Sequence, residues 1–338
     1  MKVVGENMVI ELRNLSIGYL KGKRRLYILK QLNASLHQGE LVCLVGENGV
    51  GKSTLLRTIS GVQSPLSGEI FIQQKSLKDY SAQELARAIS LVLTDRIYAG
   101  NLTVKEIVTL GRHPYTNWLG ILDGEDQKKV EWSMEITGIR NMGDQLISEL
   151  SDGQFQKTLI ARALAQDTDI IILDEPTAHL DVTNKIVVMK LLKDLAGKTG
   201  KSVLMATHEL ELGLQIADHL WMAFRNDIML TGAPEDLVLN GAFHRMINND
   251  SIIFDDSNGR FTIKYKTDKT CTLSGEKTAY SLTRNALQRK GWSVSPGKSD
   301  VMIKITQADT GYAWQVEHEQ LKEQADSIGD LLKILGNI

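Results

Sequence analysis

The sequence contains little cysteine and little net charge. Its 338 residues include two cysteines, Cys43 in an apolar run and Cys271 far from it. Two thiols so far apart do not form a disulfide framework, and they fit a reducing compartment. The formal net charge is −2, and the sequence pI is near 6.4. A protein that neutralises many phosphates of a nucleic acid needs a basic excess, so we expect no nucleic-acid partner.

Long apolar segments are also missing. No run of about 18 consecutive apolar residues occurs, so we expect no segment that spans a bilayer. The N-terminal stretch MKVVGENMVIELRNL lacks an apolar region long enough for a signal peptide, and none is expected. The hydrophobic fraction of 42% and the charged fraction of 24% are those of an ordinary globular protein. If the protein serves a membrane process, we expect it to act through a partner.

Strand and helix patterns alternate over the first 240 residues. Residues 8–19 and 26–37 alternate apolar and polar side chains, which predicts two half-buried strands of an antiparallel sheet. The remaining predicted elements are strands 40–46, 169–174, 202–207 and 219–224 and helices 52–61, 124–138, 153–166, 183–196 and 209–217. Capping boxes at Ser81–Glu84 and Thr103–Glu106 predict two further helix starts. Such alternation predicts a mostly parallel sheet that is covered on both faces.

The character of the sequence changes near residue 250, where NNDSIIFDDSNG is polar and rich in turn formers. Beyond this predicted linker, the segments FTIKYKT, KTCTLS, VMIKIT and YAWQVEH and helices near 279–290 and 325–335 indicate a small α+β domain. Its aromatic residues, Tyr280, Trp292, Tyr312 and Trp314, form either a ligand pocket or the core of the domain. The core is the commoner use of aromatics in a small domain. We expect a regulatory or dimer-stabilising role for this domain.

A glycine-rich loop follows the apolar segment 40–46. The run Gly46-Glu47-Asn48-Gly49-Val50-Gly51-Lys52-Ser53 matches the pattern G-x-x-x-x-G-K-[ST]. The glycines allow backbone N–H groups to turn toward the α- and β-phosphates, Lys52 can reach the β- and γ-phosphates, and the hydroxyl of Ser53 suits Mg²⁺. A strand before the loop and a helix after it are the context that this motif requires. We therefore predict a site for a nucleoside triphosphate and Mg²⁺.

Two carboxylates end the apolar strand 169–174. Ile170-Ile171-Ile172-Leu173 is followed by Asp174 and Glu175. Ligands of a parallel sheet gather beyond the carboxyl ends of its strands, so both acids should face the nucleotide. We expect Asp174 to hold Mg²⁺ through water and Glu175 to polarise the attacking water of a phosphoryl-transfer reaction. Without the phosphate loop, such a pair could equally be a solvated strand end.

These motifs belong to an ordered set. The set comprises Tyr19, Gly46–Thr54, Ser151–Gln154, Asp174–Glu175, the loop 178–181 (Ala-His-Leu-Asp) and His208. The segment Leu150-Ser151-Asp152-Gly153-Gln154 resembles the signature sequence of ABC ATPases, and the ordered set resembles that family over roughly residues 8–240. The phosphate loop alone is shared by a very large superfamily, whereas the ordered set is far more specific.

The resemblance implies an α/β fold. We expect a P-loop ABC-type nucleotide-binding domain at 1–248, with a mostly parallel sheet, an antiparallel β subdomain and a helical subdomain at about 95–165. A small C-terminal α+β accessory domain is expected at 249–338. In this family two domains meet head to tail with ATP between them, so we expect an ATPase that works as a homodimer.

The resemblance also implies roles for individual residues. Ser151 and Gly153 of one copy would contact the γ-phosphate held by Lys52 of the other copy, and His208 would hydrogen-bond the γ-phosphate. Tyr19 would stack on the adenine, although a tyrosine that ends a strand is often packing. The expected nucleotide-binding residues are Tyr19, Gly46, Asn48, Gly49, Gly51, Lys52, Ser53, Thr54, Ser151, Gly153, Gln154 and Asp181. The expected catalytic residues are Lys52, Glu175 and His208, and the expected Mg²⁺ site comprises Ser53, Thr94 and Asp174.

Two positions depart from the family pattern. The family usually carries a glutamine after the strand at 89–93, where it approaches Mg²⁺, and this chain has Thr94 there. Thr94 acts through a water or contributes little, and Asp95 is the other candidate. Asp152 replaces the first glycine of the commonest signature. Its carboxylate would repel phosphates, so we expect it to face away from them.

One segment points to a class within the family. Thr103–Val108 followed by 111–115 (Gly-Arg-His-Pro-Tyr) is similar to a stretch in importers of ferric siderophores, haem and cobalamin. The resemblance implies a subunit that drives import of an iron chelate, haem or cobalamin through a separate membrane permease, supplied by an extracytoplasmic substrate-binding protein. It would lie peripherally on the cytoplasmic face of the bacterial inner membrane. We expect Tyr115 and Trp118 to lie on the surface that meets the permease, with ordinary packing as the alternative for each.

Two other functions are compatible with an ABC-type ATPase. A soluble clamp could act in cluster assembly, translation or DNA repair, but the modest net charge and the lack of a long coiled-coil insertion do not favour it. An exporter subunit is the second alternative, although exporters often fuse their membrane part and none is fused here.

Overall fold

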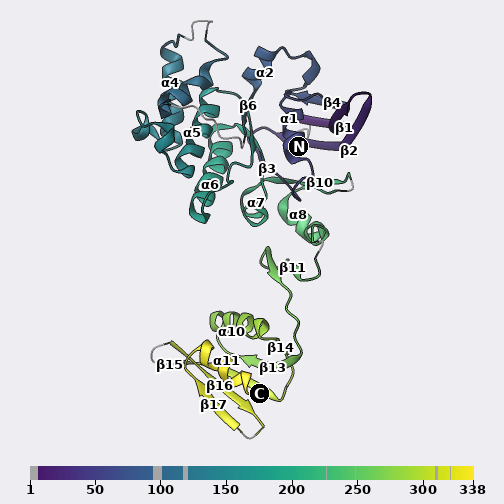
Figure 1. Ribbon diagram of the computed structural model, residues 1–338, viewed down its shortest axis with the longest axis vertical. Helices are drawn as coiled ribbons and strands as arrows, with labels where there is room; N and C mark the ends of the chain where they lie inside the picture. Colours follow the sequence, from purple (N-terminus) through teal and green to yellow (C-terminus); the bar gives the residue numbers. More distant parts are fainter. Residues whose placement is uncertain are drawn as a thin grey trace. The chain divides into compact units, whose positions relative to one another are not determined.

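The chain folds into two compact units (Figure 1). The computed structural model describes residues 7–93, 101–116, 121–225, 227–247, 249–308, 311–319 and 321–338. The first unit comprises Met1–Met246 together with Phe254–Arg260, and the second comprises Ile247–Ile253 together with Phe261–Ile338. Across the described residues, no helix combines the length and the apolar character needed to cross a membrane.

A six-stranded sheet lies at the centre of the first unit, in the order β10-β9-β3-β8-β7-β6. Its strands are β3 (Leu41–Gly46), β6 (Ile89–Val92), β7 (Ile170–Asp174), β8 (Ser202–Ala206), β9 (His219–Ala223) and β10 (Met229–Gly232). Only the edge strand β10 is antiparallel to its neighbour. Every residue of β3, β7 and β8 is buried. Because successive side chains point to opposite faces, this burial means that both faces of the sheet are covered.

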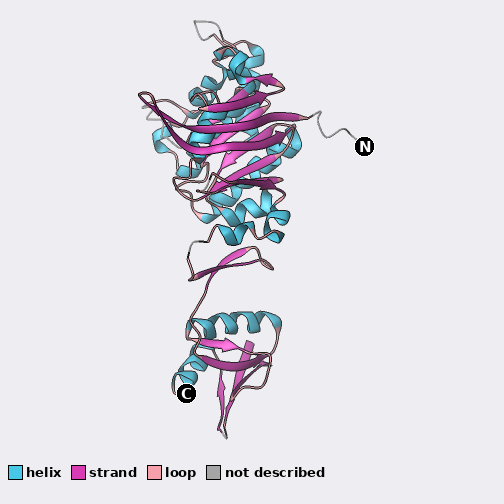
Figure 2. Ribbon diagram, turned by 90° about the vertical axis from the view of Figure 1, so that its right-hand side faces the viewer, coloured by secondary structure: helices cyan, strands magenta, loops and turns pink. Residues whose placement is uncertain are grey.

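A four-stranded antiparallel sheet, in the order β2-β1-β4-β5, packs beside it. It contains β1 (Met8–Lys21), β2 (Arg24–His37), β4 (Ser67–Ile72) and the short β5 (Lys75–Ser76). The two strands predicted from the alternating N-terminal pattern are therefore confirmed. Figure 2 shows the strands of the first unit with helices around them.

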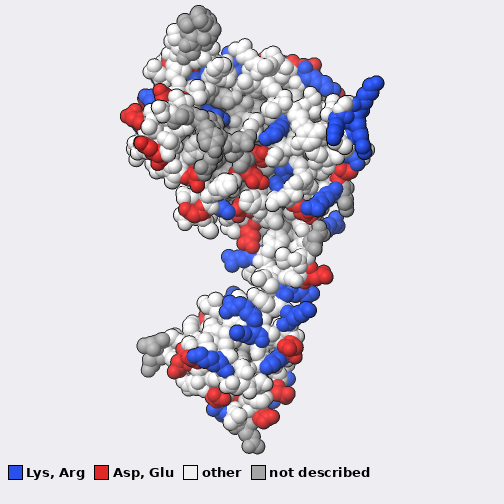
Figure 3. Space-filling model, viewed as in Figure 1, with Lys and Arg blue, Asp and Glu red and all other residues white. Residues whose placement is uncertain are grey.

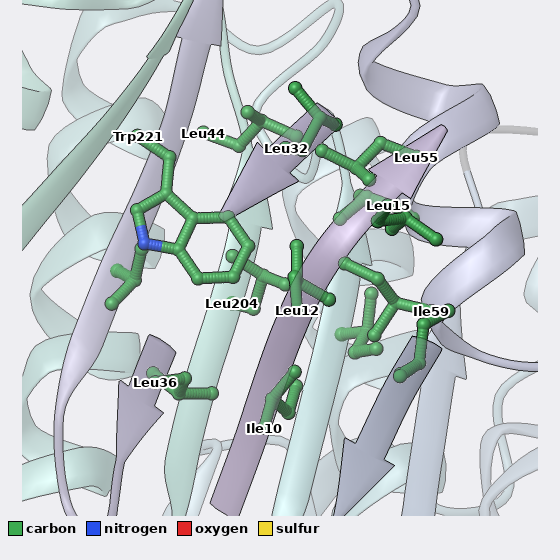
Figure 4. Packing of buried hydrophobic residues seen from close by; sticks show 14 of the residues in the cluster. Ile10, Leu12, Leu15, Leu32, Leu36, Leu44, Leu55, Ile59, Leu204 and Trp221 are labelled. Atoms are coloured by element: carbon green, nitrogen blue, oxygen red, sulfur yellow. The ribbon is translucent and has the colours of Figure 1, made fainter. Parts of the chain in front are cut away.

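An aliphatic core joins the two sheets and the helix α1 (Lys52–Ile59). Figure 4 shows Trp221 of β9 among leucines and isoleucines from both sheets and from α1, and all of these side chains are almost completely buried. Burial of each such side chain contributes about 1.5–3 kcal/mol of stability. The core therefore holds the end of β3 and the start of α1, which together carry the glycine-rich loop.

The other helices of the first unit lie between the strands in the sequence. They are α2 (Ala82–Ala88), α3 (Val104–Thr109), α4 (Gly124–Ile136), α5 (Asp152–Ala165), α6 (Val182–Thr199), α7 (Leu210–Ile216), α8 (Pro234–Leu239) and α9 (Ala242–Arg245). Short 3₁₀ turns occur at Leu77–Asp79, Leu110–Arg112, Arg140–Met142 and Ile147–Glu149. Both predicted capping boxes are present, at the starts of α2 and α3. Helices α3, α4 and α5 share a separate small core.

The hairpin formed by β11 (Ile252–Asp255) and β12 (Arg260–Ile263) contains the boundary between the two units. Phe254 is buried and stacks on Phe243 of α9, with ring centroids 4.8 Å apart. His244 contacts the carboxylate of Asp256 at 2.9 Å. These contacts explain why residues 254–260 pack with the first unit although they follow residue 248, where the sequence predicts the domain boundary.

The second unit is a five-stranded sheet with two helices. The strand order is β14-β13-β15-β16-β17, with β13 (Lys269–Ser274), β14 (Trp292–Val294), β15 (Val301–Ala308), β16 (Gly311–His318) and β17 (Leu321–Ala325). The helices α10 (Lys277–Arg289) and α11 (Ile328–Gly336) contribute to the same core as the buried side chains of the sheet. Along β15, buried Val301, Ile303 and Ile305 alternate with exposed Met302 and Lys304. The helices therefore cover one face of this sheet.

The predicted fold class, an α/β nucleotide-binding domain followed by a small α+β domain, is confirmed. The strands that were not predicted are β4, β5, β10, β11, β14 and β17, and β11 lies within the predicted linker. Each is short or lies at or near a sheet edge, where exposed positions weaken the alternating pattern. The segment 261–267 is a strand only to Ile263, and the last helix begins at Ile328. Trp292 and Trp314 lie in the core, whereas Tyr312 is partly exposed and its hydroxyl donates to Glu276.

Candidate functional site

The glycine-rich loop connects the buried strand β3 to helix α1. Gly49 and Gly51 have φ values of +77° and +110°, in the region that favours glycine. A Cβ atom at Gly46 would lie 2.5 Å from the carbonyl oxygen of Ala223, and one at Gly51 would lie 2.4 Å from Cγ2 of Ile28. The glycine pattern is therefore a steric requirement of this loop, whose following helix directs its N-terminal N–H groups outward.

Lys52 is the first residue of α1, and its side chain is buried. Its Nζ donates hydrogen bonds to the carbonyl oxygens of Gly46 at 2.9 Å and Glu47 at 3.3 Å. Burial lowers the pKa of Lys52, while the charges of Glu175 and Asp174 act in the opposite direction. An ammonium group in this setting is held beneath the loop by neutral oxygens, with two carboxylates near it. A phosphate is a stronger partner for such a group than a carbonyl oxygen.

Asp174 ends β7 and is 4% exposed. Burial raises its pKa, the charge of Glu175 raises it further, and a side-chain hydrogen bond from Ser53 acts in the opposite direction. Ser53 and Asp174 thus present a hydroxyl oxygen and a carboxylate side by side at the start of α1. Mg²⁺ prefers one or two carboxylates together with waters and substrate phosphates, so this donor pair fits Mg²⁺. Within the described residues, no group of three or more His, Cys, Asp or Glu side chains could hold a metal ion.

Glu175 follows directly and has a left-handed backbone, with φ +48°. Its N–H donates to the carbonyl oxygen of Ala206 in the neighbouring strand at 3.0 Å. A non-glycine residue rarely adopts this conformation, and such strain is common at functional sites. His208 Nδ1 lies 3.6 Å from Glu175 Oε2. Beyond the end of β8, the second ring nitrogen of His208 lies 3.2 Å from Glu209 Oε1.

Tyr19 lies in β1 near the tip of its hairpin with β2. Its hydroxyl is 3.1 Å from Oγ1 of Thr54 in α1, and 50% of the residue is exposed. Leu26, opposite Tyr19 in the strand pair and therefore on the same face, is 40% exposed. Basic side chains gather at this tip (Figure 3), where the exposed residues are Lys21, Lys23, Arg24 and Arg25. The exposed ring beside α1 is available for stacking.

The predicted signature segment starts helix α5. Ser151 is its N-cap, with a capping box in which Ser151 Oγ accepts from the N–H of Gln154 and the side chain of Gln154 accepts from the N–H of Ser151. A Cβ atom at Gly153 would lie 2.9 Å from Oδ1 of Asn184. Asn184 in turn donates to the carboxylate of Asp181, which caps α6. The starts of α5 and α6 therefore meet here, and a larger residue than glycine would displace the Asn184 side chain.

The predicted site residues fall into two groups. The first group lies at the carboxyl ends of β3, β7 and β8 and comprises Lys52, Ser53, Asp174, Glu175 and His208. Beside it, Tyr19 of β1 contacts Thr54 of α1. Ser151, Gly153, Gln154 and Asp181 form the second group at the starts of α5 and α6. Gly46, Asn48, Gly49 and Gly51 lie in the loop. Thr94 and its alternative Asp95, like Trp118, lie outside the described residues.

Three other residues need comment, namely Asp152 and Tyr115, for which the sequence analysis stated expectations, and Glu209, which it missed. Asp152 is exposed and lines a pocket together with Glu175 and His179. Tyr115 is half-buried between two guanidinium groups, at 4.0 Å from Arg112 and 5.0 Å from Arg87, so it packs within its own chain. Sequence reasoning missed Glu209 as the partner of His208, although the adjacent His-Glu pair at the end of a buried strand was a usable signal.

Two family models match the chain. Residues 29–178 match the model described as ABC transporter, and residues 268–336 match the iron ABC transporter C-terminal domain. The second match covers most of the small α+β unit, for which sequence motifs suggested no function.

Relatives match over most of the chain. An uncharacterized ABC transporter ATP-binding protein of Methanocaldococcus jannaschii is 32% identical over 83% of this chain and 97% of its own length. The ferric enterobactin transport ATP-binding protein of Escherichia coli is 34% identical over 72% of this chain and 88% of its own length. The cobalamin import ATP-binding protein of Halobacterium salinarum is 33% identical over 72% of this chain and 61% of its own length.

A solved structure matches the fold of the first unit. It is the dimeric ATP-binding cassette in a post-hydrolysis state bound to ADP and Pi. It is 28% identical, covers 67% of this chain and 98% of its own, and has a TM-score of 0.58.

Proposed function

The chain belongs to the family of ABC transporter ATP-binding proteins, and we propose that it drives import of an iron chelate through a separate membrane permease. As a member of this family it is an ATPase. The observation that carries the substrate class is the match of residues 268–336 to the iron ABC transporter C-terminal domain. The ferric enterobactin relative supports the same class, and the cobalamin relative makes cobalamin the second candidate. Haem is implied only by the resemblance of the sequence to this importer class.

We assign the first step of the cycle, nucleotide binding, to the glycine-rich loop. Lys52 exchanges its two carbonyl partners for the β- and γ-phosphates of ATP, and the N–H groups at the start of α1 receive the same phosphates. Because burial lowers the pKa of Lys52, an incoming polyanion stabilises its charged form. Tyr19 stacks on the adenine, which its exposed ring and its contact with α1 support.

We assign Mg²⁺ coordination to Ser53 and, through water, to Asp174, with Thr94 as a further candidate. The hydrogen bond between Ser53 and Asp174 supports this assignment, because it keeps the two oxygen groups close to each other. When bound, Mg²⁺ would neutralise charge on the β- and γ-phosphates. It would also remove the cost of the buried Asp174 carboxylate, whose pKa is raised in the chain alone.

Glu175 and His208 are the residues proposed to act on the reacting atoms. Glu175 accepts a hydrogen bond from the attacking water, whose oxygen forms a bond to the γ-phosphorus while the bond to the β–γ bridging oxygen breaks. His208 donates to a γ-phosphate oxygen. The contact of His208 with Oε1 of Glu209, which also accepts a hydrogen bond from Lys185, holds the imidazole in place. This chain of contacts supports a ring that is oriented before the nucleotide arrives.

We propose that two copies close around ATP. Ser151 and Gly153 of one copy contact the γ-phosphate bound by Lys52 of the other copy, with Gln154 and Asp181 beside them. The N-terminus of the 14-residue helix α5 is suited to an anion. ATP binding then favours the closed dimer, and hydrolysis favours the open one. We place the dimer peripherally on the cytoplasmic face of the bacterial inner membrane, with an extracytoplasmic substrate-binding protein that delivers the chelate to the permease.

The second unit is proposed to be an accessory domain with a regulatory or dimer-stabilising role. It has its own core, distinct from the cores of the first unit. Removal of this unit should therefore alter dimer formation or transport control while ATP binding remains.

The decisive variant is Glu175→Gln, which keeps the shape of the side chain but removes its charge. We expect ATP hydrolysis to fall at least 100-fold while ATP affinity stays within about twofold, because the loop that binds the phosphates is untouched. Glu135→Gln, on the exposed side of α4, is the matched control and should hydrolyse ATP at the normal rate. A Glu175→Gln protein with undiminished turnover would remove Glu175 from the mechanism.

The trapped variant also tests the partner and the cargo. Tagged Glu175→Gln protein is expressed in its host, the membranes are solubilised gently, and the co-purifying chains are identified by mass spectrometry. A polytopic membrane protein supports the importer, whereas soluble partners or nucleic acid alone would favour the clamp. Uptake of ⁵⁵Fe-loaded siderophore, labelled haem and labelled cobalamin by cells with wild-type or Glu175→Gln protein then identifies the cargo. Export of a substrate instead of uptake would overturn the direction that we propose.

A further inference from the structure

A pocket at the other end of the central sheet contains two histidines. It is lined by Ser35 and His37 of β2, His219 and Trp221 of β9, and Thr231 and Gly232 of β10. The pocket therefore lies where the antiparallel sheet faces the central sheet. Val42 pairs with His219 and Gly46 with Ala223, so the pocket lies about 13 Å along β9 from the phosphate loop. None of its residues belongs to the nucleotide site.

A single carboxylate contacts both imidazoles. Glu40 Oε2 lies 3.2 Å from Nδ1 of His37 and also accepts the backbone N–H of His37 at 3.0 Å. Glu40 Oε1 lies 3.5 Å from Nδ1 of His219. That Nδ1 atom is buried and has no hydrogen-bond partner, and Glu40 is the carboxylate that contacts it. The carboxylate thus sits behind the two rings, on the Nδ1 side of each.

This arrangement decides which ring nitrogens are available. A carboxylate oxygen only accepts hydrogen bonds, so Nδ1 of His37 carries the proton, and the lone pair of the neutral ring lies on Nε2. The same tautomer of His219 gives its buried Nδ1 a favourable contact with Glu40. The His37 and His219 side chains are 34% and 42% exposed, and both residues line the pocket.

We propose that Nε2 of His37 and Nε2 of His219 bind one divalent transition-metal ion in this pocket, with Glu40 as the positioning residue. Histidine ligands of a metal commonly donate their other ring N–H to a carboxylate, which fixes the tautomer and raises the basicity of the ligand. Imidazole nitrogen suits Zn²⁺, Fe²⁺, Ni²⁺ and Cu²⁺, whereas Mg²⁺ and Ca²⁺ prefer oxygen ligands. An anionic ligand is disfavoured because Glu40 lies behind both rings.

The proposed site has two protein ligands, and waters complete the coordination. The hydroxyl groups of Ser35 and Thr231 line the same pocket and are available to hydrogen-bond those waters. Because His37 belongs to the antiparallel sheet and His219 to the central sheet, the ion links the two sheets of the first unit. Binding should therefore raise the melting temperature of that unit as well as occupy a site.

The test uses the full-length chain without a histidine tag and without nucleotide, titrated with Zn²⁺ by calorimetry and with Co²⁺ by visible absorption, in excess Mg²⁺. We expect one ion per chain. His37→Gln and His219→Gln should each weaken binding at least tenfold, and Glu40→Gln should weaken it about 10- to 100-fold. His244→Gln is the matched control, since His244 also contacts a carboxylate but lies on α9, and it should bind as the wild type does.

A second measurement does not depend on the stability of any variant. Zn²⁺ should protect His37 and His219 of the wild-type chain from diethylpyrocarbonate, as mapped by mass spectrometry, while exposed His244 still reacts. The proposal is overturned if the wild-type chain binds no transition metal. It is equally overturned if the folded His37→Gln/His219→Gln double variant binds with unchanged affinity and stoichiometry, or if Zn²⁺ protects other histidines instead.

Discussion

The two units of the chain bury polar side chains in different ways. Among the described residues of the second unit, Thr283 is the one fully buried polar side chain, and Trp314 Nε1 donates to it at 2.9 Å. The first unit buries Lys52 and Asp174, which carry opposite charges and lie near each other. The second unit therefore has an almost entirely apolar interior, with its buried polar group hydrogen-bonded. The first unit buries charged groups that hydrophobic packing does not require.

A buried charge is not by itself a sign of function, as a second pair in the first unit shows. Arg112 donates to Asp126 at 2.8 Å, and both side chains are almost fully buried. Burial raises the pKa of Asp126, but the hydrogen bond and charge of Arg112 and the hydrogen bond from the N–H of Asp123 lower it by more. The pKa of Asp126 is therefore below its ordinary value. The pKa of Asp174 is instead raised. The direction of the shift therefore distinguishes Asp126, whose hydrogen bonds and ion pair outweigh the effect of burial, from Asp174, for which burial dominates.

The largest effect is expected in the second unit. Trp314→Ala removes a core side chain that is 6% exposed, and it should lower the free energy of unfolding of that unit by about 3–5 kcal/mol. ATP binding by the first unit should be retained. Urea unfolding followed by circular dichroism, with an ATP-binding assay in parallel, measures both. The control is Met302→Ala, on the exposed side of the same sheet, which should change stability by no more than about 0.5 kcal/mol. Loss of ATP binding in Trp314→Ala would mean that the two units do not fold independently.

In the first unit we expect the opposite result, a loss of ATP binding without a loss of stability. Lys52→Ala should reduce ATP affinity by roughly 10²–10³-fold, because a charged donor to the phosphates is lost. Stability without nucleotide should not fall, since a buried ammonium with a lowered pKa is removed. Binding of a fluorescent ATP analogue and thermal unfolding measure the two quantities. Lys193→Ala, which breaks a half-exposed ion pair with Asp218, is the control for loss of a lysine. Normal ATP binding by Lys52→Ala would contradict the assigned role.

Truncation tests where one unit ends. A chain that ends at Ile247 loses Phe254, which is buried against Phe243, and should unfold about 3 kcal/mol more easily than a chain that ends at Lys264. Both truncated chains should still bind ATP, because the phosphate loop and its core lie within the first 246 residues. Chemical unfolding of the two truncated chains side by side gives the difference. Equal stability would mean that the hairpin belongs to the second unit.

The smallest expected effect is the pH dependence of stability in two variants, Asp174→Asn and Asp126→Asn. The folded pKa of Asp174 is raised, so its ionised form destabilises the fold, and Asp174→Asn should be more stable than the wild type near pH 7 without Mg²⁺. That advantage should disappear as the pH falls to the ordinary aspartate pKa of about 4. The folded pKa of Asp126 is lowered, so Asp126→Asn should be less stable near pH 7, with a deficit that closes as the pH falls through the folded pKa. Urea unfolding between about pH 3.5 and 8 measures both signs, and two variants of equal sign would contradict the comparison.

Much of the first unit could be predicted because its signals are local. The alternating pattern of β1 and β2, the apolar runs of β3 and β7 and the capping boxes of α2 and α3 depend on residues near each other in the sequence. Strands β4 and β17 escaped prediction because their exposed positions leave little periodicity, and pairing with a distant strand makes them strands. Residues 254–260 pack with the first unit for a similar reason, since Phe254 meets an aromatic ring of α9.

The sequence by itself determined the chemistry of the nucleotide site. Gly46–Ser53 and Asp174–Glu175 carry residue types that a phosphate and Mg²⁺ require, at spacings that one strand and one turn impose. Only the tertiary structure decided which of these groups meet. Ser53 donates to Asp174, His208 lies between Glu175 and Glu209, and Glu40 contacts both His37 and His219. The physical reason is that hydrogen bonds and desolvation act over a few ångströms, and residues from separate strands and helices come within that range only when those elements pack together.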